Sequence, residues 1–239
     1  MKHPPQIIFE DEHILVVNKP AGFLSIPDRY NPKLYNLKTF FENRGTPVFM
    51  VHRLDKDTSG VLCLAKNAKC HKALNQQFES RQVKKDYLCL SIGVLFDKSG
   101  LIDRPIAKSQ SRAGRMVVHK SGKPSQTQYE VLQEFGHYSL VKAEPLTGRQ
   151  HQIRVHMSAI GHPLLVDPIY SNKAGFFLSE IKRKYNLGKD REERPLISRT
   201  TLHAAALSFQ HPETGATLRF EAPLPKDMNA VIRQLEKWA

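Results

Sequence analysis

Cysteine is scarce in this chain, which holds three cysteines among 239 residues and no CxxC pair. Cys63 and Cys89 each lie within an apolar run, where a small buried residue is the ordinary role. An odd number of cysteines without metal-ligand spacing is typical of a reducing compartment. The cysteine content therefore does not indicate a disulfide framework.

Long apolar runs are also missing. Acids interrupt the N-terminal "MKHPPQIIFEDEH" before an apolar stretch of signal-peptide length forms, and no later stretch approaches the length of a membrane-spanning helix. The sequence also has no glycine-rich phosphate loop and no internal repeat. We therefore expect a cytoplasmic protein with no membrane partner.

Acidic residues are outnumbered, with 36 lysines and arginines against 23 aspartates and glutamates and a net charge of +13. Such an excess favours a polyanionic partner, most often a nucleic acid. Residues 104–123 contain no acid and six basic residues, which are Arg104, Lys108, Arg112, Arg115, Lys120 and Lys123. We expect this segment to be a loop or ribbon that contacts RNA; the alternative is a solvated basic loop.

The apolar pattern predicts more strands than helices. Pairs of strands with turn residues between them are expected at 6–22, 127–146 and 202–225, and single strands at 61–66 and 84–93. Helices are expected at 68–80 and near the C-terminus, where Val231, Leu235 and Trp238 form an apolar stripe. The fold class is therefore α+β, with a mixed, mostly antiparallel central sheet and flanking helices. We expect residues 1–239 to form a single domain, with 171–199 as an insertion that contains a short helix near Ser179–Tyr185.

The stretch "HRLDKDTSG", residues 52–60, places two acids in one polar turn. An EF-hand calcium loop starting at Asp55 would need a carboxylate at its twelfth position, where Lys66 stands, so calcium is excluded. Three interpretations stay open at this point. Asp55 is an aspartyl-phosphatase nucleophile, a turn former like Asp57, or the nucleophile or general base of an RNA-modifying site.

The stretch "LTGRQHQIRVHMSAIGHP", residues 146–163, offers a cation that would keep Asp55 ionised. A helix starting near Gln150 would put Ile153, Met157 and Ile160 on one face, and His151, Arg154 and Ser158 on the opposite face. His151 and His156 are five residues apart, which is the wrong spacing for two metal ligands on one helix face.

Three motifs together resemble a known family. "HRLDKDTSGVL", "KKDY" and "TGRQHQIRVHM", in this order, resemble the RluA-type pseudouridine synthases, and "GHPLLVDPIY" and "LHAAALSFQHPETG" are also similar to that family. The resemblance extends from about Ile8 to Pro225. It implies a catalytic domain with a central RNA-binding cleft and the isomerisation of uridine to pseudouridine in rRNA or tRNA.

The resemblance also implies roles for single residues. Asp55 corresponds to the catalytic aspartate, Tyr87 to the tyrosine that packs on the target base, and Arg154 to the basic residue that pairs with the aspartate. Arg53 matches an arginine that fills the gap left by the flipped base. The other expected substrate-binding residues are Arg149, His151, Arg112, Arg115 and Lys120.

The reaction itself is redox-neutral, so the resemblance implies no cofactor and no metal. Some relatives carry an N-terminal ribosomal-protein-like module. Only 51 residues precede His52 here, and we expect them to belong to the catalytic sheet rather than to that module. We also expect a monomer.

Two rival functions are a non-catalytic RNA-binding protein, disfavoured by Asp55 and Arg154, and an aspartyl phosphatase, which magnesium dependence would reveal.

Overall fold

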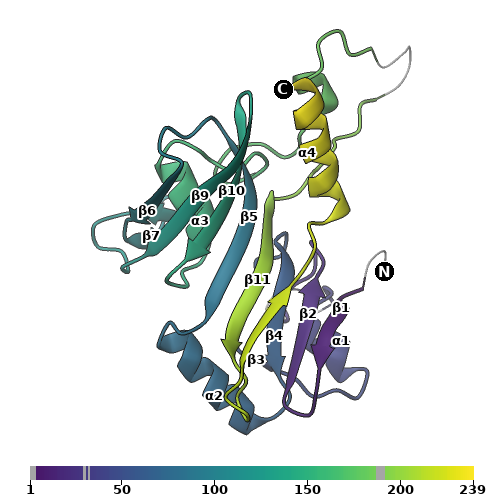
Figure 1. Ribbon diagram of the computed structural model, residues 1–239, viewed down its shortest axis with the longest axis vertical. Coiled ribbons are helices and arrows are strands. Elements are labelled where there is room, and N and C mark those ends of the chain that lie inside the picture. Colours follow the sequence, from purple (N-terminus) through teal and green to yellow (C-terminus); the bar gives the residue numbers. More distant parts are fainter. Residues whose placement is uncertain (1–3, 29–30, 32, 187–191) are drawn as a thin grey trace. The chain divides into compact units, whose positions relative to one another are not determined.

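The computed structural model of the protein describes residues 4–28, 31, 33–186 and 192–239 (Figure 1). The chain divides into two compact units. The first unit comprises Met1–Tyr87 and His203–Pro223, and the second comprises Leu88–Leu202 and Leu224–Ala239. Strand β5 (Lys84–Ile92) carries the chain from the first unit into the second. Within the part of the chain that the structure describes, no helix has the length and apolar character needed to cross a membrane.

The first unit is built on a sheet with the strand order β1-β2-β4-β11, to which β3 and β12 add as partners of β4 and β11. Its pairs are antiparallel except for the parallel pair of β4 and β11. The strands are β1 (Gln6–Glu10), β2 (Ile14–Lys19), β3 (Phe49–Met50), β4 (Ser59–Ala65), β11 (Leu202–Gln210) and β12 (Thr217–Glu221).

Helices α1 (Leu37–Glu42) and α2 (Ala68–Glu79) pack on this sheet. Successive residues of a strand point to opposite faces, and β2 is buried on both. Leu15 and Val17 belong to the apolar cluster that includes α1, whereas Ile14 and Val16 belong to the cluster that includes α2. Because apolar clusters cover both faces of β2, the strand is a continuous apolar run.

Gly60 allows the parallel pair of β4 and β11 to form. It lies opposite Ala204 with φ +117°, and a Cβ at this position would sit 2.1 Å from the Ala204 carbonyl oxygen. No larger residue fits there, so the glycine of "DTSG" lets the two backbones approach directly after the polar turn.

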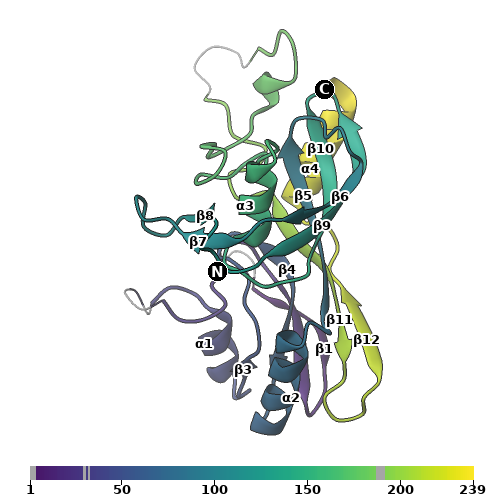
Figure 2. The ribbon, with the colours of Figure 1, turned by 90° about the vertical axis from the view of Figure 1, so that its left-hand side faces the viewer.

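The second unit has the strand order β5-β10-β9-β6 and a separate two-stranded ribbon, β7-β8 (Figure 2). Its pairs β10-β9, β6-β9 and β7-β8 are antiparallel. The remaining elements are β6 (Ser99–Asp103), β7 (Ile106–Lys108), β8 (Met116–Val118), β9 (Gln126–Phe135), β10 (Tyr138–Pro145), α3 (Gln152–Ala159), the 3-10 turn Leu178–Glu180 and α4 (Lys226–Trp238).

Helix α4 covers an apolar cluster of the second unit through Met228, Val231 and Leu235. The expected stripe was therefore right for Val231 and Leu235 but wrong for Trp238, which is 38% exposed at the end of the helix. Pro225 takes the N-cap position of α4 without a side-chain bond.

The α+β class and the mixed, largely antiparallel sheet are confirmed, as are the strand pairs expected at 6–22, 127–146 and 202–225. The helix expected near Ser179–Tyr185 is wrong, because only the short 3-10 turn forms there. Polar side chains hold that turn, with Glu193 accepting from the backbone and hydroxyl of Ser179.

Residues 187–191 of the expected insertion lie outside the described residues. The segment 171–199 belongs to the second unit and lies between α3 and β11 in the chain.

Candidate active site

A buried lysine supports the polar turn of "HRLDKDTSG" in the first unit. Lys19 is fully buried, and its Nζ donates to the carbonyl oxygens of Pro20 (3.1 Å), Phe23 (2.7 Å) and Lys56 (3.0 Å). A buried ammonium is tolerated only where several acceptors surround it. The peptide that follows Asp55 is therefore tied to the end of β2.

The two sides of Asp55 are held by further bonds. The Leu54 amide donates to Ser25 Oγ (3.0 Å), and the Ser25 hydroxyl donates back to the Leu54 carbonyl (2.9 Å). The Thr58 amide donates to the Asp55 carbonyl (3.1 Å), which closes the turn in which Asp57 lies. A half-buried Asp55 thus stands on a short loop whose backbone is fixed before and after it.

Tyr87 lies near Asp55 in the same unit. The ring packs against the apolar cluster that includes Leu54 and Leu62, and the residue is half-buried. Burial raises the pKa of the Tyr87 hydroxyl, and the nearby Asp55 carboxylate raises that pKa further. The hydroxyl therefore stays protonated at neutral pH, so a neutral polar group lies near the Asp55 carboxylate.

His52 and Arg53 precede Asp55 and have different environments. His52 Nε2 accepts a bond from the Cys63 amide (3.0 Å), and its ring stacks on Phe78 at 4.7 Å between centroids. Burial, together with the Lys85 ammonium, lowers the pKa of His52 to about 3, so the imidazole is neutral and structural. Arg53 is exposed, as a residue that contacts a substrate must be.

In the second unit, the "TGRQHQ" loop leads into α3. The helix begins at Gln152, two residues later than expected, and His151 takes the N-cap position with φ +56°. The buried Gln152 side chain organises the loop: its Oε1 accepts from the Thr147 hydroxyl (2.7 Å) and the Arg149 amide (3.0 Å). Gln152 Nε2 donates to the Gln126 carbonyl (2.8 Å), which ties the loop to β9.

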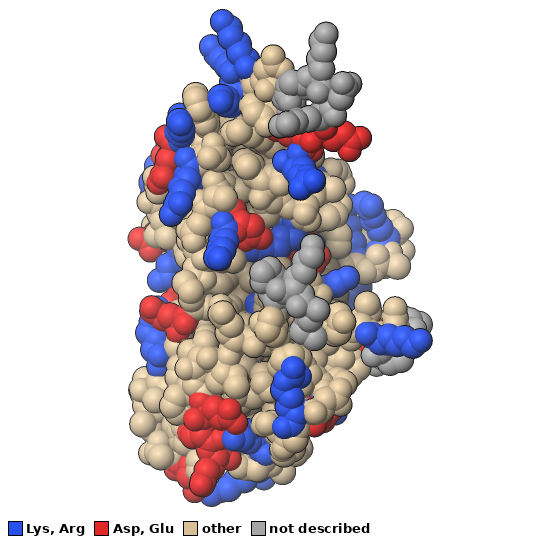
Figure 3. All heavy atoms as spheres, turned by 90° about the vertical axis from the view of Figure 1, so that its right-hand side faces the viewer, with Lys and Arg blue, Asp and Glu red and all other residues tan. Residues whose placement is uncertain are grey.

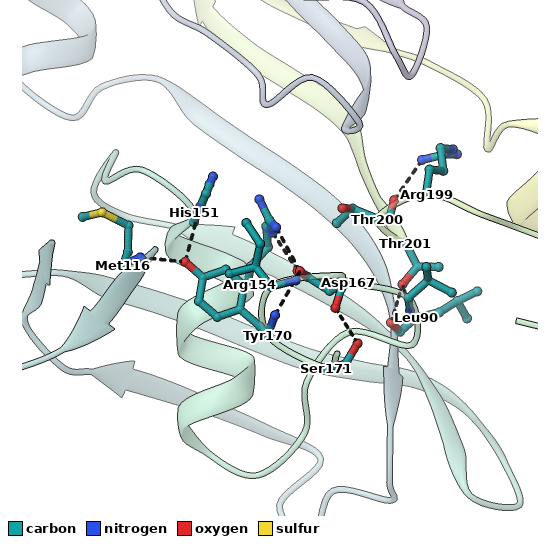
Figure 4. Close-up of polar contacts among 12 residues, drawn as sticks. Leu90, Met116, His151, Arg154, Asp167, Tyr170, Ser171, Arg199, Thr200 and Thr201 are labelled. Carbon is teal, nitrogen blue, oxygen red and sulfur yellow. Dashed lines mark hydrogen bonds and ion pairs between the residues drawn. The ribbon is translucent and has the colours of Figure 1, made fainter. Parts of the chain in front are cut away.

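Arg154 forms a buried ion pair with Asp167 (Figure 4). Arg154 Nε donates to Oδ2 at 2.7 Å and Nη2 donates to Oδ1 at 2.9 Å, while Asp167 Oδ1 also accepts from the amides of Ile169 and Tyr170. The side chains of Arg154 and Asp167 are 6% and 0% exposed. This two-bond geometry fixes the plane of the guanidinium.

Tyr170 connects this ion pair to the ribbon β7-β8. The Tyr170 hydroxyl accepts from the Met116 amide (3.0 Å) and shares a hydrogen bond with His151 Nδ1 (3.0 Å). The guanidinium carbons of Arg154 and Arg115 lie 5.1 and 5.7 Å from the centroid of the Tyr170 ring. One buried aromatic therefore positions groups from α3 and from the ribbon.

The basic segment 104–123 is the ribbon β7-β8 with its flanks, so a ribbon was correctly expected. Arg112 and Lys120 are exposed, whereas Arg115 is half-buried beside Tyr170. His156 of α3 donates from Nε2 to the Arg104 carbonyl (2.9 Å) at the start of the segment. On the face drawn in Figure 3, basic and acidic side chains are interspersed, so the net charge is not gathered in one patch there.

The structure brings the expected residues together in two groups. Asp55 and Tyr87 lie close together in the first unit, and Arg154, His151 and Arg115 surround Tyr170 in the second. The pair expected between Asp55 and Arg154 joins residues of different units and stays a prediction.

Sequence reasoning missed three supporting residues, which are Lys19, Asp167 and Tyr170. The signal for Asp167 and Tyr170 was the acid that interrupts the apolar run "PLLVDPIY", a stretch that had been noted without a role. A lysine after "ILVVN" in a buried strand was the corresponding signal for Lys19.

Metal-dependent phosphoryl transfer needs several carboxylates around the nucleophile. Within the described ranges, no group of three His, Cys, Asp or Glu side chains gathers around Asp55 at metal-ligand distances. The geometry therefore gives the aspartyl-phosphatase interpretation no support.

Comparison with known proteins agrees with this geometry. The sequence model of the family described as RNA pseudouridylate synthase matches residues 13–159. The chain is 36% identical over 228 residues to the Dual-specificity RNA pseudouridine synthase RluA of Escherichia coli, covering 92% of this chain and 96% of that protein. It is also 36% identical over 237 residues to the Ribosomal large subunit pseudouridine synthase D of Nitrosomonas europaea, covering 97% of this chain but 65% of that protein.

Solved structures show the same likeness. Human RNA Pseudouridylate Synthase Domain Containing 4 superposes with a TM-score of 0.71 at 25% identity, covering 97% of this chain and 93% of that one. Human RNA Pseudouridylate Synthase Domain Containing 1 gives a TM-score of 0.69 at 27% identity, with coverages of 98% and 95%.

Proposed function

Because this chain belongs to the RNA pseudouridylate synthase family, we propose that it isomerises particular uridines in structured RNA, either rRNA or tRNA, to pseudouridine. The observation that carries the proposal is the Asp55 carboxylate, which stands on a loop anchored by Lys19 and Ser25 and next to the protonated Tyr87. The names of the bacterial relatives support RNA as the substrate.

The reaction cleaves the bond between ribose carbon and uracil nitrogen and forms a bond from the same ribose carbon to a ring carbon. That ring carbon loses its proton and the released ring nitrogen takes one up, so atoms and electrons balance and no oxidant, reductant or co-substrate is consumed. We assign Asp55 the covalent or proton-transfer chemistry, for which a fixed, ionised carboxylate is suited.

The target base must leave the helical stack before it can react, which costs a few kcal/mol. Stacking on Tyr87 would return about 1–3 kcal/mol of that cost. We assign the exposed Arg53 the role of filling the gap in the RNA, and Arg112, Lys120 and Arg149 would contact phosphates.

Arg154 is proposed to pair with Asp55 and to keep it ionised. Its buried contact with Asp167 supports this role, because that contact holds the guanidinium in one orientation. Asp167 is thus a positioning residue for Arg154. We further propose that the two units act as one catalytic domain, because the family match at residues 13–159 includes parts of both.

The test compares two aspartates of the same turn. Asp55→Asn keeps size and shape but removes the nucleophile or base. Single-turnover pseudouridine formation, on an unmodified RNA that the wild type modifies, should therefore vanish while RNA binding persists. Asp57→Asn still makes turn hydrogen bonds and should retain most of the activity. Arg154→Lys keeps the charge but loses the planar fork, and its rate should fall between the two.

The measurement is pseudouridine formation with enzyme in excess, with binding checked separately by filter retention. Near-wild-type turnover of Asp55→Asn, or an inactive Asp57→Asn, would show that the roles are wrongly assigned. If the wild-type protein binds RNA but modifies no cellular RNA, the result would instead favour a non-catalytic RNA-binding protein.

A further inference from the structure

Three turns of the first unit bring a histidine, a cysteine and a glutamate together, in a place that the proposed reaction does not use. His13 lies between β1 and β2, Cys70 in the first turn of α2, and Glu213 between β11 and β12. One ligand atom from each of the three side chains lies within 4.8 Å of the others. The sequence does not suggest this group, since its members are far apart in the chain.

His13 carries an unsatisfied buried nitrogen. Its Nδ1 is inaccessible to solvent and has no hydrogen-bond partner within the described part of the chain. The His13 backbone is held in place, because its amide donates to Asp11 Oδ1 at 2.7 Å. A buried polar atom without a partner is unfavourable, so a ligand that takes the nitrogen lone pair would be favoured.

Cys70 lies buried at the start of α2. It is 1% exposed, and as the third residue of α2 it donates its amide to the Asn67 side chain (2.9 Å) at the start of the helix. Cys63 and Cys89 are not part of this group, and burial raises the pKa of the Cys63 thiol well above its usual range and that of Cys89 to about 12.

Glu213 is exposed and supplies the third ligand. Both of its carboxylate oxygens accept from Lys69 Nζ, at 2.9 and 2.8 Å. Each oxygen has a second lone pair, and the Lys69 side chain is 75% exposed, so it can move into solvent when a cation arrives. A bound cation would therefore displace the Lys69 ammonium from the Glu213 carboxylate, or share that carboxylate with it.

His211 borders the group but is not a ligand. Its Nδ1 accepts from the amides of Glu213 (3.3 Å) and Thr214 (3.1 Å), and its Nε2 donates to Asp11 Oδ2 (2.9 Å). Both nitrogens are therefore occupied. The ring meets His13 edge to face at 5.6 Å between centroids and holds that imidazole in place.

We propose that His13, Cys70 and Glu213 bind one Zn²⁺ ion. One nitrogen, one sulfur and one oxygen ligand suit zinc, and the fourth tetrahedral position would be taken by water on the exposed side of Glu213. Binding releases the Cys70 proton and forms the sulfur–zinc bond, with no change in oxidation state. The ion would join three turns of the first unit, and it takes no part in the isomerisation.

The first experiment titrates Zn²⁺ into the full-length protein, stripped with a chelator, in competition with a chromophoric zinc indicator. We expect one equivalent per chain and a rise in the melting temperature. Co²⁺ in place of Zn²⁺ should give the thiolate-to-cobalt charge-transfer band of a cysteine ligand. Cys70→Ala should abolish that band, and the surface variant Glu213→Gln should weaken binding at least about tenfold.

Cys63→Ala is the matched control, because it removes a buried cysteine of the same unit that is outside the group, and it should keep the cobalt band. Less than one equivalent of zinc, a cobalt spectrum without the thiolate band, or equal zinc affinity in wild type and Glu213→Gln would overturn the proposal. Pseudouridine formation by Cys70→Ala is expected to match wild type, so this test is independent of the proposed catalytic roles.

Discussion

Buried charged residues hold the segments of this protein that carry the proposed reactive groups. Lys19 is fully buried and held by backbone carbonyls, and Arg154 is held by the carboxylate of Asp167. Neither would be stable in the interior without these partners. Each supports a functional segment, since Lys19 fixes the loop of Asp55 and Asp167 fixes the guanidinium of Arg154.

Asp167→Asn tests the second of these supports. The substitution leaves the Arg154 charge buried without its carboxylate, and breaking such a pair costs about 3–5 kcal/mol of unfolding free energy. Urea unfolding followed by circular dichroism measures this loss. Glu134→Gln, which breaks the exposed pair with Lys98, is the control and should cost less than about 1 kcal/mol. Equal losses in the two variants would mean that the buried pair contributes no more than a surface pair.

His52 predicts a pH dependence of stability. Its pKa is about 3 in the folded state, far below the ordinary value, because burial disfavours the charged ring. As the pH falls below about 6.5, the unfolded chain therefore binds a proton that the folded protein does not, and stability decreases. This loss continues down to the folded pKa, with a slope of up to about 1.4 kcal/mol per pH unit for one proton.

His52→Gln should reduce that slope, since glutamine keeps an acceptor for the Cys63 amide but does not titrate. The measurement is the unfolding free energy from urea titrations between pH 6.5 and 4. The exposed His137 provides the control, and His137→Gln should leave the slope unchanged. His156, whose pKa burial also lowers, would still contribute the same sign of dependence in both variants.

Among the elements, the ribbon β7-β8 combines a fixed base with a basic, exposed tip. His156 bonds to the Arg104 carbonyl at one end, and the Tyr170 hydroxyl bonds to the Met116 amide in β8. Arg112, between the strands, is exposed. The element is thus attached to α3, the helix that carries Arg154, and presents cations beside it.

Replacing Arg112 and Lys120 with glutamine should weaken RNA binding and flatten its salt dependence. Each lost phosphate contact changes the slope of log affinity against log salt by about 0.7–0.9. Lys38 and Lys69, exposed on the first unit, serve as a control pair that removes the same net charge when changed to glutamine. Equal slopes for the two double variants would show that the salt dependence of RNA binding comes from the net charge of the protein and not from contacts of the ribbon.

At the scale of the whole molecule, the expected catalytic residues are divided between the two units. Asp55 and Tyr87 belong to the first, and Arg154 with its support from Asp167 belongs to the second. The chain crosses from one to the other within β5, directly after Tyr87. A reaction that uses all of these residues therefore depends on both units.

The proposed isomerisation should not depend on a divalent cation. The bonds broken and formed lie within one nucleotide, and the proposed mechanism uses the Asp55 carboxylate and no metal-bound group. Pseudouridine formation in excess EDTA, on RNA shown to remain folded, should match that in its absence. Loss of turnover that magnesium restores would contradict the proposed chemistry, whereas a lowered melting temperature alone would agree with the proposed zinc site.

The sequence predicted much of this fold, because strand alternation and turn residues are local. The hairpins around Gly136 and at "HPETG", the buried strand after the polar turn and the helix 68–80 all follow from patterns within a dozen residues. The helix near Ser179 was wrong, because no apolar stripe supports one there and side chains from Glu193 hold a tighter turn.

Long and specific motifs in the sequence also determined the family and the residues expected to act. Tertiary structure alone decided which groups support them. The carbonyls around Lys19, the bond of Tyr170 to Met116 and the grouping of His13, Cys70 and Glu213 join segments that no periodicity relates. The partner of a buried charge is whichever group the fold brings within about 3 Å, and a linear sequence carries no measure of that distance.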